Sequence, residues 1–338
     1  MNKTERYARQ TVFSHIGKEG QEKLLKSKVT IIGMGALGTV AANNLCRSGV
    51  GHIRMIDRDY VEFTNLQRQI LFTEDDARQS LPKVIAAYNH LSEVNSEITL
   101  EPVIADVNPS NIENFTSGAD LLLDATDNWE IRFLINEICH KHRIPWIYGG
   151  ALGGEGMTMN ILPGDDKPCL RCFTGGSMPP SHSCGTFGVL NMITNVIASI
   201  QTAEAIKILT GSDSIRAELL TVDLWGNNIA SIEIRKNDDC PVCVHKRYEY
   251  FGKITGAYTT SLCGSNSVQV VPPRPVKADF HALAEKLKAA GTVRFNDFTL
   301  TFADTQYEIT LFLDGRAIIK NAIDLNSAKS VYNEYIGL

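Results

Sequence analysis

The stretch VTIIGMGALG, residues Val29 to Gly38, decides the fold of this 338-residue protein. Its β-branched beginning predicts a strand, and its glycines, spaced Gly-x-Gly-x-x-Gly, predict a tight turn that opens a helix. A helical run, Thr39 to Arg47, and a second strand, Ile53 to Ile56, follow and complete a parallel βαβ unit. Backbone N–H groups of such a turn can approach a phosphate at the helix N-terminus, which favours nucleotide binding over a plain glycine turn. The candidate residues are Gly33, Gly35, Ala36 and Gly38.

Outward from this unit, the first half of the chain alternates between helical and strand patterns. Apolar residues at helical spacing predict one amphipathic helix from Asp76 to Glu93. Alternating elements of this kind are typical of a doubly wound α/β sheet. Further strands are expected at Ile98 to Ala105, Leu121 to Asp124 and Pro145 to Tyr148, with helices at Ser110 to Thr116 and Asn128 to His142.

The second half predicts an antiparallel extension and a further small unit. We expect the first sheet to be extended by a strand at Met157 to Leu162 and by a hairpin around Gly226-Asn-Asn228. A long helix is expected between them, at Val189 to Leu209. Beyond a proline-rich linker we expect a strand, a helix (Asp279 to Ala289), three strands and a helix (Ser327 to Tyr335). The expected fold is therefore a doubly wound, mainly parallel Rossmann-like sheet with an antiparallel extension in residues 1–250, plus a small α/β domain in residues 254–338.

Composition excludes several classes of protein. Apolar residues make up 43% and charged residues 21%, which is ordinary globular usage and rules out wholesale disorder. The net charge of -5 leaves no basic excess to neutralise the phosphates of a nucleic acid. No run of about 18 apolar residues predicts a membrane span, and the first residues lack the apolar core of a signal peptide. A cytoplasmic location is expected.

Polar residues gather after the second strand of the βαβ unit. Asp57 ends that strand, where a carboxylate can accept hydrogen bonds from ribose hydroxyls. Cationic and amide donors suit a phosphate whose charge grows during a reaction, although a solvated surface loop is an equally good interpretation. These donors are Asn65, Gln67, Arg68 and Lys83.

Asp127 and Asn128 follow the apolar strand Leu121 to Asp124. Ligands of doubly wound folds bind at the carboxyl ends of strands, so Asp127 is a candidate ligand of Mg²⁺ beside a triphosphate. Alternatively, Asp127 is the N-cap of the helix that begins near Trp129. The local pattern supports both roles.

Two Cys-x-x-Cys pairs, Cys169/Cys172 and Cys240/Cys243, provide four thiolates for a structural Zn²⁺ site. A redox pair with two incidental cysteines is the alternative. Cys184 precedes the helix at Val189, where a lowered pKa would suit nucleophilic chemistry.

The combination of motifs resembles the MoeB/ThiF-type adenylyltransferases, which are related to ubiquitin-activating enzymes. The resemblance spans residues 3 to 250, and Ala36 stands where that family usually has glycine. It is carried, in the family's order, by Arg6-Tyr-Ala-Arg9-Gln, GMGALG, Asp57 to Gln69, Pro82-Lys83, Asp124-Ala-Thr-Asp-Asn128, CLRC and CPVC.

The resemblance implies an activity and roles for individual residues. A homodimer would use ATP and Mg²⁺ to adenylate the C-terminal glycine of a ubiquitin-like sulfur-carrier protein ending in Gly-Gly, and a sulfur donor protein would act later. Asp57 would bind the ribose, and Asp127 the Mg²⁺. Arg9 would reach the neighbouring subunit's phosphates. Cys184 matches the crossover-loop cysteine that some members use for covalent sulfur transfer and others do not need. Asn65, Arg68 and Lys83 would hold the phosphates, and Cys169, Cys172, Cys240 and Cys243 would bind zinc.

Two alternatives from other classes remain at this stage. The glycine motif and Asp57 alone would also fit a nicotinamide-dependent oxidoreductase, and a non-catalytic relative could bind a ubiquitin-like partner as a scaffold. The segment around Cys263 lacks the arginines of a rhodanese loop, so a rhodanese domain is not expected in the tail. The tail resembles a small α/β extension of some bacterial ThiF-like proteins.

Overall fold

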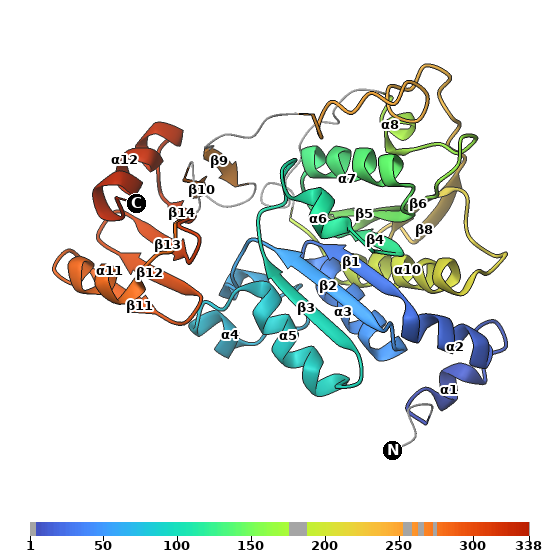
Figure 1. Ribbon diagram of the computed structural model, residues 1–338, viewed down its shortest axis with the longest axis horizontal. Coiled ribbons are helices and arrows are strands. Elements are labelled where there is room, and N and C mark those ends of the chain that lie inside the picture. The colour runs from blue at the N-terminus through green and yellow to red at the C-terminus, as the bar shows by residue number, and fades with distance from the viewer. Residues whose placement is uncertain (1–4, 176–187, 253–258, 263–266, 273–275, 338) are drawn as a thin grey trace.

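The computed structural model describes residues 5–175, 188–252, 259–262, 267–272 and 276–337. Most of the chain forms one eight-stranded sheet with the strand order β3-β2-β1-β4-β5-β6-β7-β8 (Figure 1). Its first five strands are parallel and its last three are antiparallel, as the sequence predicts. The strands are β1 (Lys28–Ile32), β2 (His52–Asp57), β3 (Thr99–Ile104), β4 (Leu121–Asp124), β5 (Trp146–Leu152), β6 (Glu155–Ile161), β7 (Leu219–Asp223) and β8 (Asn228–Ile232).

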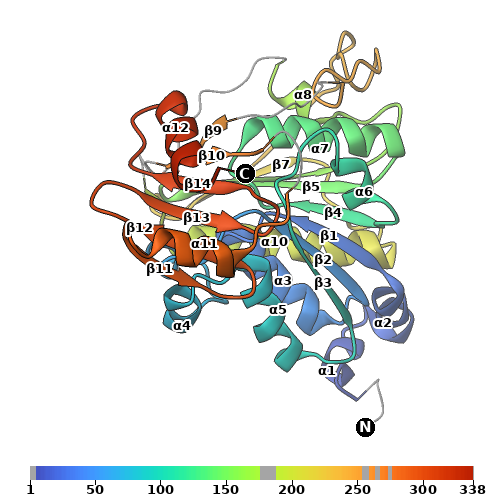
Figure 2. The same ribbon diagram turned by 60° about the vertical axis from the view of Figure 1, so that its left-hand side comes forward.

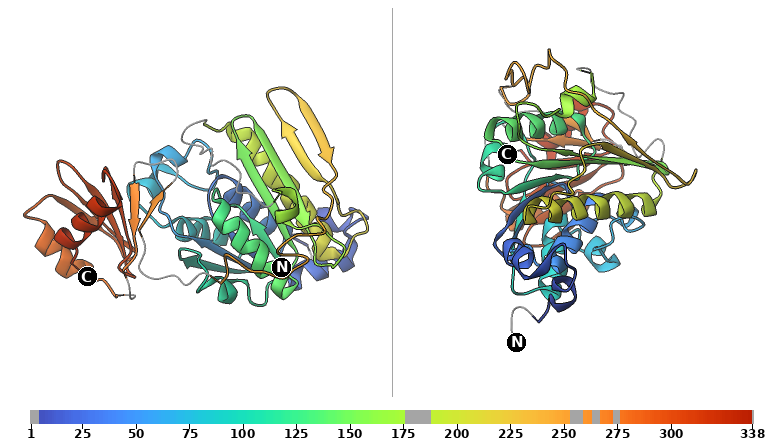
Figure 3. Two further views of the ribbon diagram at one scale, coloured as in Figure 1. Left: turned by 90° about the horizontal axis from the view of Figure 1, so that it is seen from above. Right: turned by 90° about the vertical axis from the view of Figure 1, so that its right-hand side faces the viewer.

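Helices cover both faces of this sheet, which makes it doubly wound (Figures 1 and 3). Successive residues of β4 explain how: Leu121 and Leu123 join the core on one face, and Leu122 joins the core on the other. This period of two is that of a strand buried on both sides. The first face packs against α2 (Gly17–Lys26), α3 (Ala36–Ser48), α5 (Lys83–Val94) and α10 (Asn191–Thr210), and the second against α6 (Ile112–Thr116) and α7 (Trp129–His142).

The single helix expected from Asp76 to Glu93 is wrong. The structure has α4 (Glu74–Arg78) and α5 with a turn between them. Pro82 explains the break, because it has no N–H to donate and disfavours helical geometry in the residue before it. Ser80 in the turn has φ +49°, which ends the first helix. The turn places Lys83 at the first position of α5.

The C-terminal unit is a separate six-stranded antiparallel sheet with the order β11-β12-β13-β14-β10-β9 (Figures 1 and 2). The expected single strand before its first helix is two strands, and the expected three strands after it are four. These strands are only four or five residues long, too short for a clear alternating pattern. The elements are β9 (Thr259–Leu262), β10 (Ser267–Val270), α11 (Phe280–Leu287), β11 (Thr292–Phe295), β12 (Thr299–Ala303), β13 (Glu308–Phe312), β14 (Ala317–Lys320) and α12 (Leu325–Tyr335).

The two faces of the small sheet have different neighbours. Ile309 and Ile319 point into a core with α11 and α12. Phe312 and Ile318, on the opposite face, pack against Tyr60, which lies just after β2. The small sheet therefore has a core of its own and also packs against the segment that follows β2.

The division of the chain into two domains, between residues 250 and 254, stays a prediction. None of the helices in the described ranges is long and apolar enough to cross a membrane.

Candidate nucleotide site and cysteine cluster

The glycine loop between β1 and α3 is shaped by close packing at two positions and by open space at the third. A Cβ on Gly33 would lie 2.5 Å from the carbonyl oxygen of Ala125, and one on Gly38 would lie 2.0 Å from that of Gly33. Gly33 also has φ +95°, which favours glycine. A Cβ on Gly35 would meet nothing nearer than the Gln69 amide nitrogen, at 3.8 Å. Packing therefore requires the outer glycines, and Gly35 keeps the loop open on one side.

The first turn of α3 offers unpaired donors beside that opening. The first N–H groups of a helix have no partner within the helix, and no side chain of the described ranges caps α3. Such N–H groups and the helix dipole together attract an anion. This arrangement fits a phosphate group beside Gly35 and Ala36.

Asp57 stabilises the loop that it follows. Its Oδ2 accepts the N–H of Met34 at 2.6 Å, and its Oδ1 accepts the N–H of Asp59 at 2.7 Å. Burial raises the pKa of Asp57, while the nearby charge of Lys83 opposes the rise. Its carboxylate joins the glycine loop to the segment after β2, and a ribose role for it stays a prediction.

Lys83 is buried, with its ammonium 3.3 Å from Asp59 Oδ2. Burial alone would lower the pKa of Lys83, but the carboxylates of Asp59 and Asp57 hold it above its ordinary value. Lys83 therefore keeps its charge at neutral pH, close to the glycine loop.

The segment between β2 and α4 carries the remaining predicted donors. Asn65 ends the short 3₁₀ helix η1 (Phe63–Asn65), and its Oδ1 accepts the N–H of Glu62 at 3.0 Å. Arg68 donates to the carbonyl of Thr64, and Gln67 is exposed. Gln69, which the sequence analysis did not single out, is buried with an Oε1 that has no partner among the described residues. An unpartnered buried acceptor, on a side chain whose amide nitrogen lies near Gly35, fits a ligand that donates hydrogen bonds.

Asp127 and Asn128 have different environments in the structure. The helix cap that was one interpretation of Asp127 is made by Asn128, whose Oδ1 accepts the N–H of Glu130 at 2.8 Å. Asp127 is exposed, and no hydrogen bond or ion pair within the described part of the chain engages its carboxylate. Its charge raises the pKa of Lys83, so the two groups share one electrostatic neighbourhood. A free carboxylate at the end of β4 fits a ligand of Mg²⁺.

Arg132 supports the turn that carries Asp127, although Arg132 was not among the residues predicted from the sequence. Its Nε lies 3.1 Å from the fully buried carboxylate of Asp124, and its guanidinium carbon lies 4.9 Å from the ring centroid of Trp129 and 5.1 Å from that of Tyr148. A buried ion pair of this kind fixes geometry more than it adds stability. The available signal was the four-residue spacing of Asn128, Arg132 and Asn136, which places polar side chains along one face of an apolar helix.

Arg9 lies apart from these groups within one chain. It is exposed on α1 (Ala8–Thr11), which the buried Tyr7 anchors by accepting a hydrogen bond from Asn95 at 2.9 Å. Among the described residues, no hydrogen bond or ion pair links Arg9 to the glycine loop or to Lys83. Its role across a subunit interface stays a prediction.

The two Cys-x-x-Cys pairs come together although 67 residues separate them. All four sulfur atoms lie within 4.8 Å of one another, with 3.6 Å between Cys169 and Cys240 and 3.5 Å between Cys172 and Cys243. Tetrahedral zinc with Zn–S bonds of about 2.3 Å needs sulfurs about 3.8 Å apart. The backbone N–H of Asn237 also donates to Cys172 Sγ at 3.4 Å, as is common around metal-bound thiolates. The donor set fits zinc.

The other cysteines divide into buried and undescribed ones. Cys46 and Cys139 are buried fillers, as expected, and burial raises the pKa of the Cys46 thiol to about 11. Cys184 and Cys263 lie outside the described residues.

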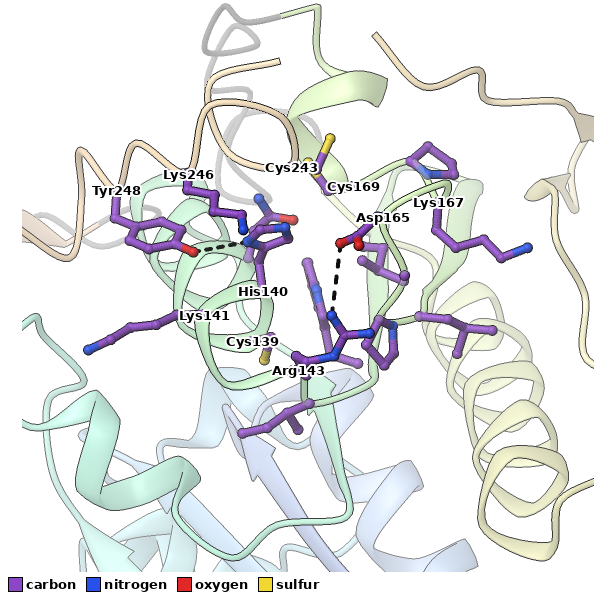
Figure 4. Close-up of a pocket in the computed structure, with 18 residues that line it drawn as sticks. Cys139, His140, Lys141, Arg143, Asp165, Lys167, Cys169, Cys243, Lys246 and Tyr248 are labelled. Atoms are coloured by element: carbon purple, nitrogen blue, oxygen red, sulfur yellow. Dashed lines mark hydrogen bonds and ion pairs between the residues drawn. The ribbon is translucent and has the colours of Figure 1, made fainter. Parts of the chain in front are cut away.

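A cavity of about 180 Å³ lies next to the cysteine cluster (Figure 4). Cys169 and Cys243 line it together with basic side chains of α7 and the following loops, and His140 Nδ1 lies 3.1 Å from the Tyr248 hydroxyl at its rim. Trp146, the first residue of β5, also lines it. The cavity is thus at the amino end of the parallel strands, whereas the glycine loop is at their carboxyl end.

Fold and site together define an α/β protein with a Rossmann-like nucleotide-binding unit. Residues 7–242 match the model of the ThiF family, and the chain belongs to that family. The chain is 37% identical, over 99% of its length and 100% of the relative's, to the sulfur carrier protein ThiS adenylyltransferase of Bacillus subtilis. It is 35% identical to the SAMP-activating enzyme E1 of Haloferax volcanii, over 71% of this chain and 88% of that protein.

Solved structures show the same fold at lower sequence identity. The crystal structure of E. coli MccB with ATP superimposes with a TM-score of 0.61 at 24% identity, covering 70% of this chain and 74% of that one. This likeness concerns the fold alone.

Proposed function

We propose that this protein adenylates the C-terminal glycine carboxylate of a small ubiquitin-like sulfur-carrier protein, with ATP as the second substrate and pyrophosphate as the leaving group. The observation that carries the proposal is the meeting of the α3 N-terminus, Lys83 and the free carboxylate of Asp127 at the carboxyl edge of the sheet. The relatives' names support it, because they are sulfur-carrier adenylyltransferases and a related activating enzyme. They favour adenylation over the oxidoreductase and scaffold alternatives.

A carboxylate is a poor electrophile, and adenylation supplies a good leaving group. A carboxylate oxygen of the carrier attacks the α-phosphorus of ATP, the bond to the bridging oxygen breaks, and pyrophosphate leaves with the electron pair. The product is an acyl-adenylate. The protein's own contribution is to position the two substrates and to neutralise the charge that develops on the phosphates.

The residues divide this work. The α3 N–H groups and Lys83 hold phosphate oxygens, and Asp57 holds the ribose end in addition to bracing the loop. Arg68 and Asn65 add donors from the segment after β2, and Gln67 lies beside them. Asp127 would hold Mg²⁺, which, when bound, shields the phosphate charges. Asn128 serves through its helix cap.

Other parts of the proposal concern the assembly. Arg9, exposed and unengaged with its own chain's site, would complete the site of a second subunit in a homodimer. The four cysteines would hold a structural Zn²⁺. Cys184 would act after adenylation, when a sulfur donor protein delivers sulfur to the activated carrier.

The carrier is proposed to be of the ThiS type rather than of the molybdopterin type. The Bacillus subtilis ThiS adenylyltransferase aligns along its whole length, including the C-terminal unit. The matched part of the Culex quinquefasciatus adenylyltransferase and sulfurtransferase MOCS3 is only 56% of that protein. A cytoplasmic enzyme of thiamine biosynthesis is the corresponding biological role.

Mass spectrometry of the carrier tests this function. The protein, ATP, Mg²⁺ and a ThiS-type carrier should yield carrier that is heavier by one adenylyl group. A molybdopterin-type carrier should react more slowly, and a carrier without its last glycine should not react. Equal reaction of both carriers would overturn the assignment of the carrier, and no adduct on either would overturn the adenylation itself.

A further inference from the structure

The C-terminal unit contacts the segment from Arg58 to Lys83 at both of its ends. At the start, Arg316 Nη2 donates to the carbonyl of Arg58 at 2.7 Å. At the end, Asn296 donates to the carbonyl of Gln79 at 2.7 Å, and Thr299 donates to that of Ser80 at 3.2 Å. Asn65, Gln67 and Arg68 lie between these contacts, and Lys83 follows directly after them. The small sheet therefore holds the segment that carries most of the proposed phosphate donors.

Arg316 is the centre of the first contact. It is 2% exposed, and its guanidinium lies 3.7 Å from the centroid of the Phe312 ring. Its Nη1 donates to Gln269 Oε1 at 3.3 Å. A buried arginine that donates to a backbone carbonyl of another unit fixes the position of that backbone, because a misplaced charge in the interior is costly.

A closed ring of contacts links the two units through this arginine. Gln269 Nε2 donates to Asp106 Oδ2 at 2.8 Å, and Asp106 Oδ1 lies 3.0 Å from Arg58 Nη1. Arg58 closes the ring through its carbonyl to Arg316. The orientation of the Gln269 amide is fixed, because an arginine can only donate and a carboxylate can only accept.

Two further ion pairs connect the ring to Lys83. Arg58 Nε lies 3.8 Å from Asp59 Oδ1, and Asp59 Oδ2 lies 3.3 Å from the Lys83 ammonium. A second link runs through Lys320, whose ammonium lies 2.6 Å from Glu62, the residue that caps η1 and so orients Asn65. Both links end on groups that the adenylation proposal assigns to phosphate.

We infer that Arg316 is a positioning residue for ATP and that the C-terminal unit serves to preset the Arg58–Lys83 segment. This inference rests on the proposed function, since it assigns that segment to the nucleotide. Arg316 touches no substrate and acts through Arg58 and Asp59. The unit thus has a role that the sequence alone did not supply.

The test compares Arg316→Gln with three other variants of the full chain. Arg294→Gln is the matched control, because Arg294 is exposed on β11 of the same unit. Val331→Ala removes buried volume from the core of the unit and controls for loss of stability alone. Arg316→Lys restores a cation that can donate to one carbonyl.

Arg316→Gln should raise the KM for ATP about tenfold, with a smaller fall in kcat, as expected for the loss of one charge-assisted hydrogen bond. Arg316→Lys should recover part of the loss. Val331→Ala should lower Tm and leave KM unchanged. An unchanged KM in Arg316→Gln, or an equal rise in Val331→Ala at the same loss of Tm, overturns the inference.

Amide hydrogen exchange separates this inference from the proposed function. Amides from Arg58 to Asn65 should exchange faster in Arg316→Gln and at the wild-type rate in Arg294→Gln, whether or not the enzyme is active. An inactive wild type with this pattern contradicts adenylation but not the bracing, whereas an active wild type with unchanged exchange contradicts the bracing. If Arg316→Gln does not fold, Gln269→Met cuts the same ring and should raise the KM about threefold.

Discussion

The surroundings of the glycine loop and the cysteine cluster both bring polar groups together. They differ in whether those polar atoms face one another or are left open to a ligand. The cysteine cluster is closed: its four sulfurs face one another, and Cys169, Cys240 and Cys243 are each less than a tenth exposed. The edge of the sheet at the glycine loop is open: as far as the described residues go, the first N–H groups of α3, the Gln69 Oε1 and the Asp127 carboxylate have no hydrogen-bond partner. We therefore expect the cysteine cluster to contribute to stability and the open polar groups to bind a ligand.

The C-terminal unit adds a third kind of region. Arg316 and Lys320 of this unit contact the segment that carries the proposed phosphate donors, although no described residue of the unit is itself assigned to the nucleotide. A residue can therefore influence a site without touching the ligand, because it can fix the backbone that carries the residues that do.

Replacing Asp127 by alanine should reduce adenylation at least about a hundredfold, since removing one preorganised electrostatic stabiliser typically costs about 3 kcal/mol. Tm should hardly move, because in the part of the chain that the structure describes no hydrogen bond or ion pair engages this carboxylate. Initial rates of adenylate formation measure the effect, with exposed Asp213→Ala as the control. If the rate of adenylate formation fell by less than about fivefold, or if Tm fell strongly, the proposed role of Asp127 as a ligand of Mg²⁺ would be wrong.

Arg9→Ala should also be inactive, because the proposed dimer site lacks its cation from the second subunit. Mixing Arg9→Ala with Asp127→Ala under subunit-exchange conditions should restore part of the activity, since mixed dimers contain one site with both residues intact. The assay is adenylate formation before and after mixing. If verified mixed dimers stay inactive, Arg9 does not act across the interface.

Loss of zinc should affect stability far more than turnover. The protein should contain about one zinc ion per chain, and Cys172→Ser should remove it and lower the free energy of unfolding by several kcal/mol. Turnover at a temperature where the variant is folded should fall only slightly. Cys139→Ala, which affects a buried cysteine outside the cluster, should keep its zinc. Wild-type protein with four reduced thiols and no zinc contradicts the structural site.

Cys184→Ala should have the smallest effect on adenylation, because forming the adenylate needs no thiol. Any defect should appear when a sulfur donor protein acts on the activated carrier. Adenylate formation and sulfur incorporation are measured separately on the same carrier. A variant that fails to form the adenylate would show that Cys184 acts earlier than proposed.

The sequence predicted the parallel sheet well because its signals are local. The strand before Gly33, the glycine spacing and the apolar run of β4 each determine their own element within about ten residues. The break between α4 and α5 was missed, although Pro82 is a signal for it. The apolar residues keep their helical spacing across the turn, and this spacing predicted one continuous helix. The number of strands in the C-terminal unit was wrong because strands of four or five residues carry little periodicity.

Residue type alone suggested the chemistry of the candidate site. The four cysteines come together as their spacing suggested, whereas the roles of Lys83 and Asp127 stay predictions. Arg132 and Arg316 were missed for different reasons. Arg316 acts through Arg58, which lies 258 residues away in the sequence. Arg132 contacts Asp124 and Gly149, 8 and 17 residues away, and its sequence signal was the polar spacing along its own helix. Only the fold shows that these arginines are buried and which backbone they hold.

The exchange of labelled pyrophosphate into ATP tests the central claim most directly, because adenylation is reversible. Exchange should require the protein, Mg²⁺ and a carrier with a free C-terminal glycine carboxylate, and an amidated carrier should abolish it. Neither an oxidoreductase nor a scaffold has a route to this reaction. Absence of exchange with every carrier ending in Gly-Gly, under conditions where the protein is folded and dimeric, would contradict the account.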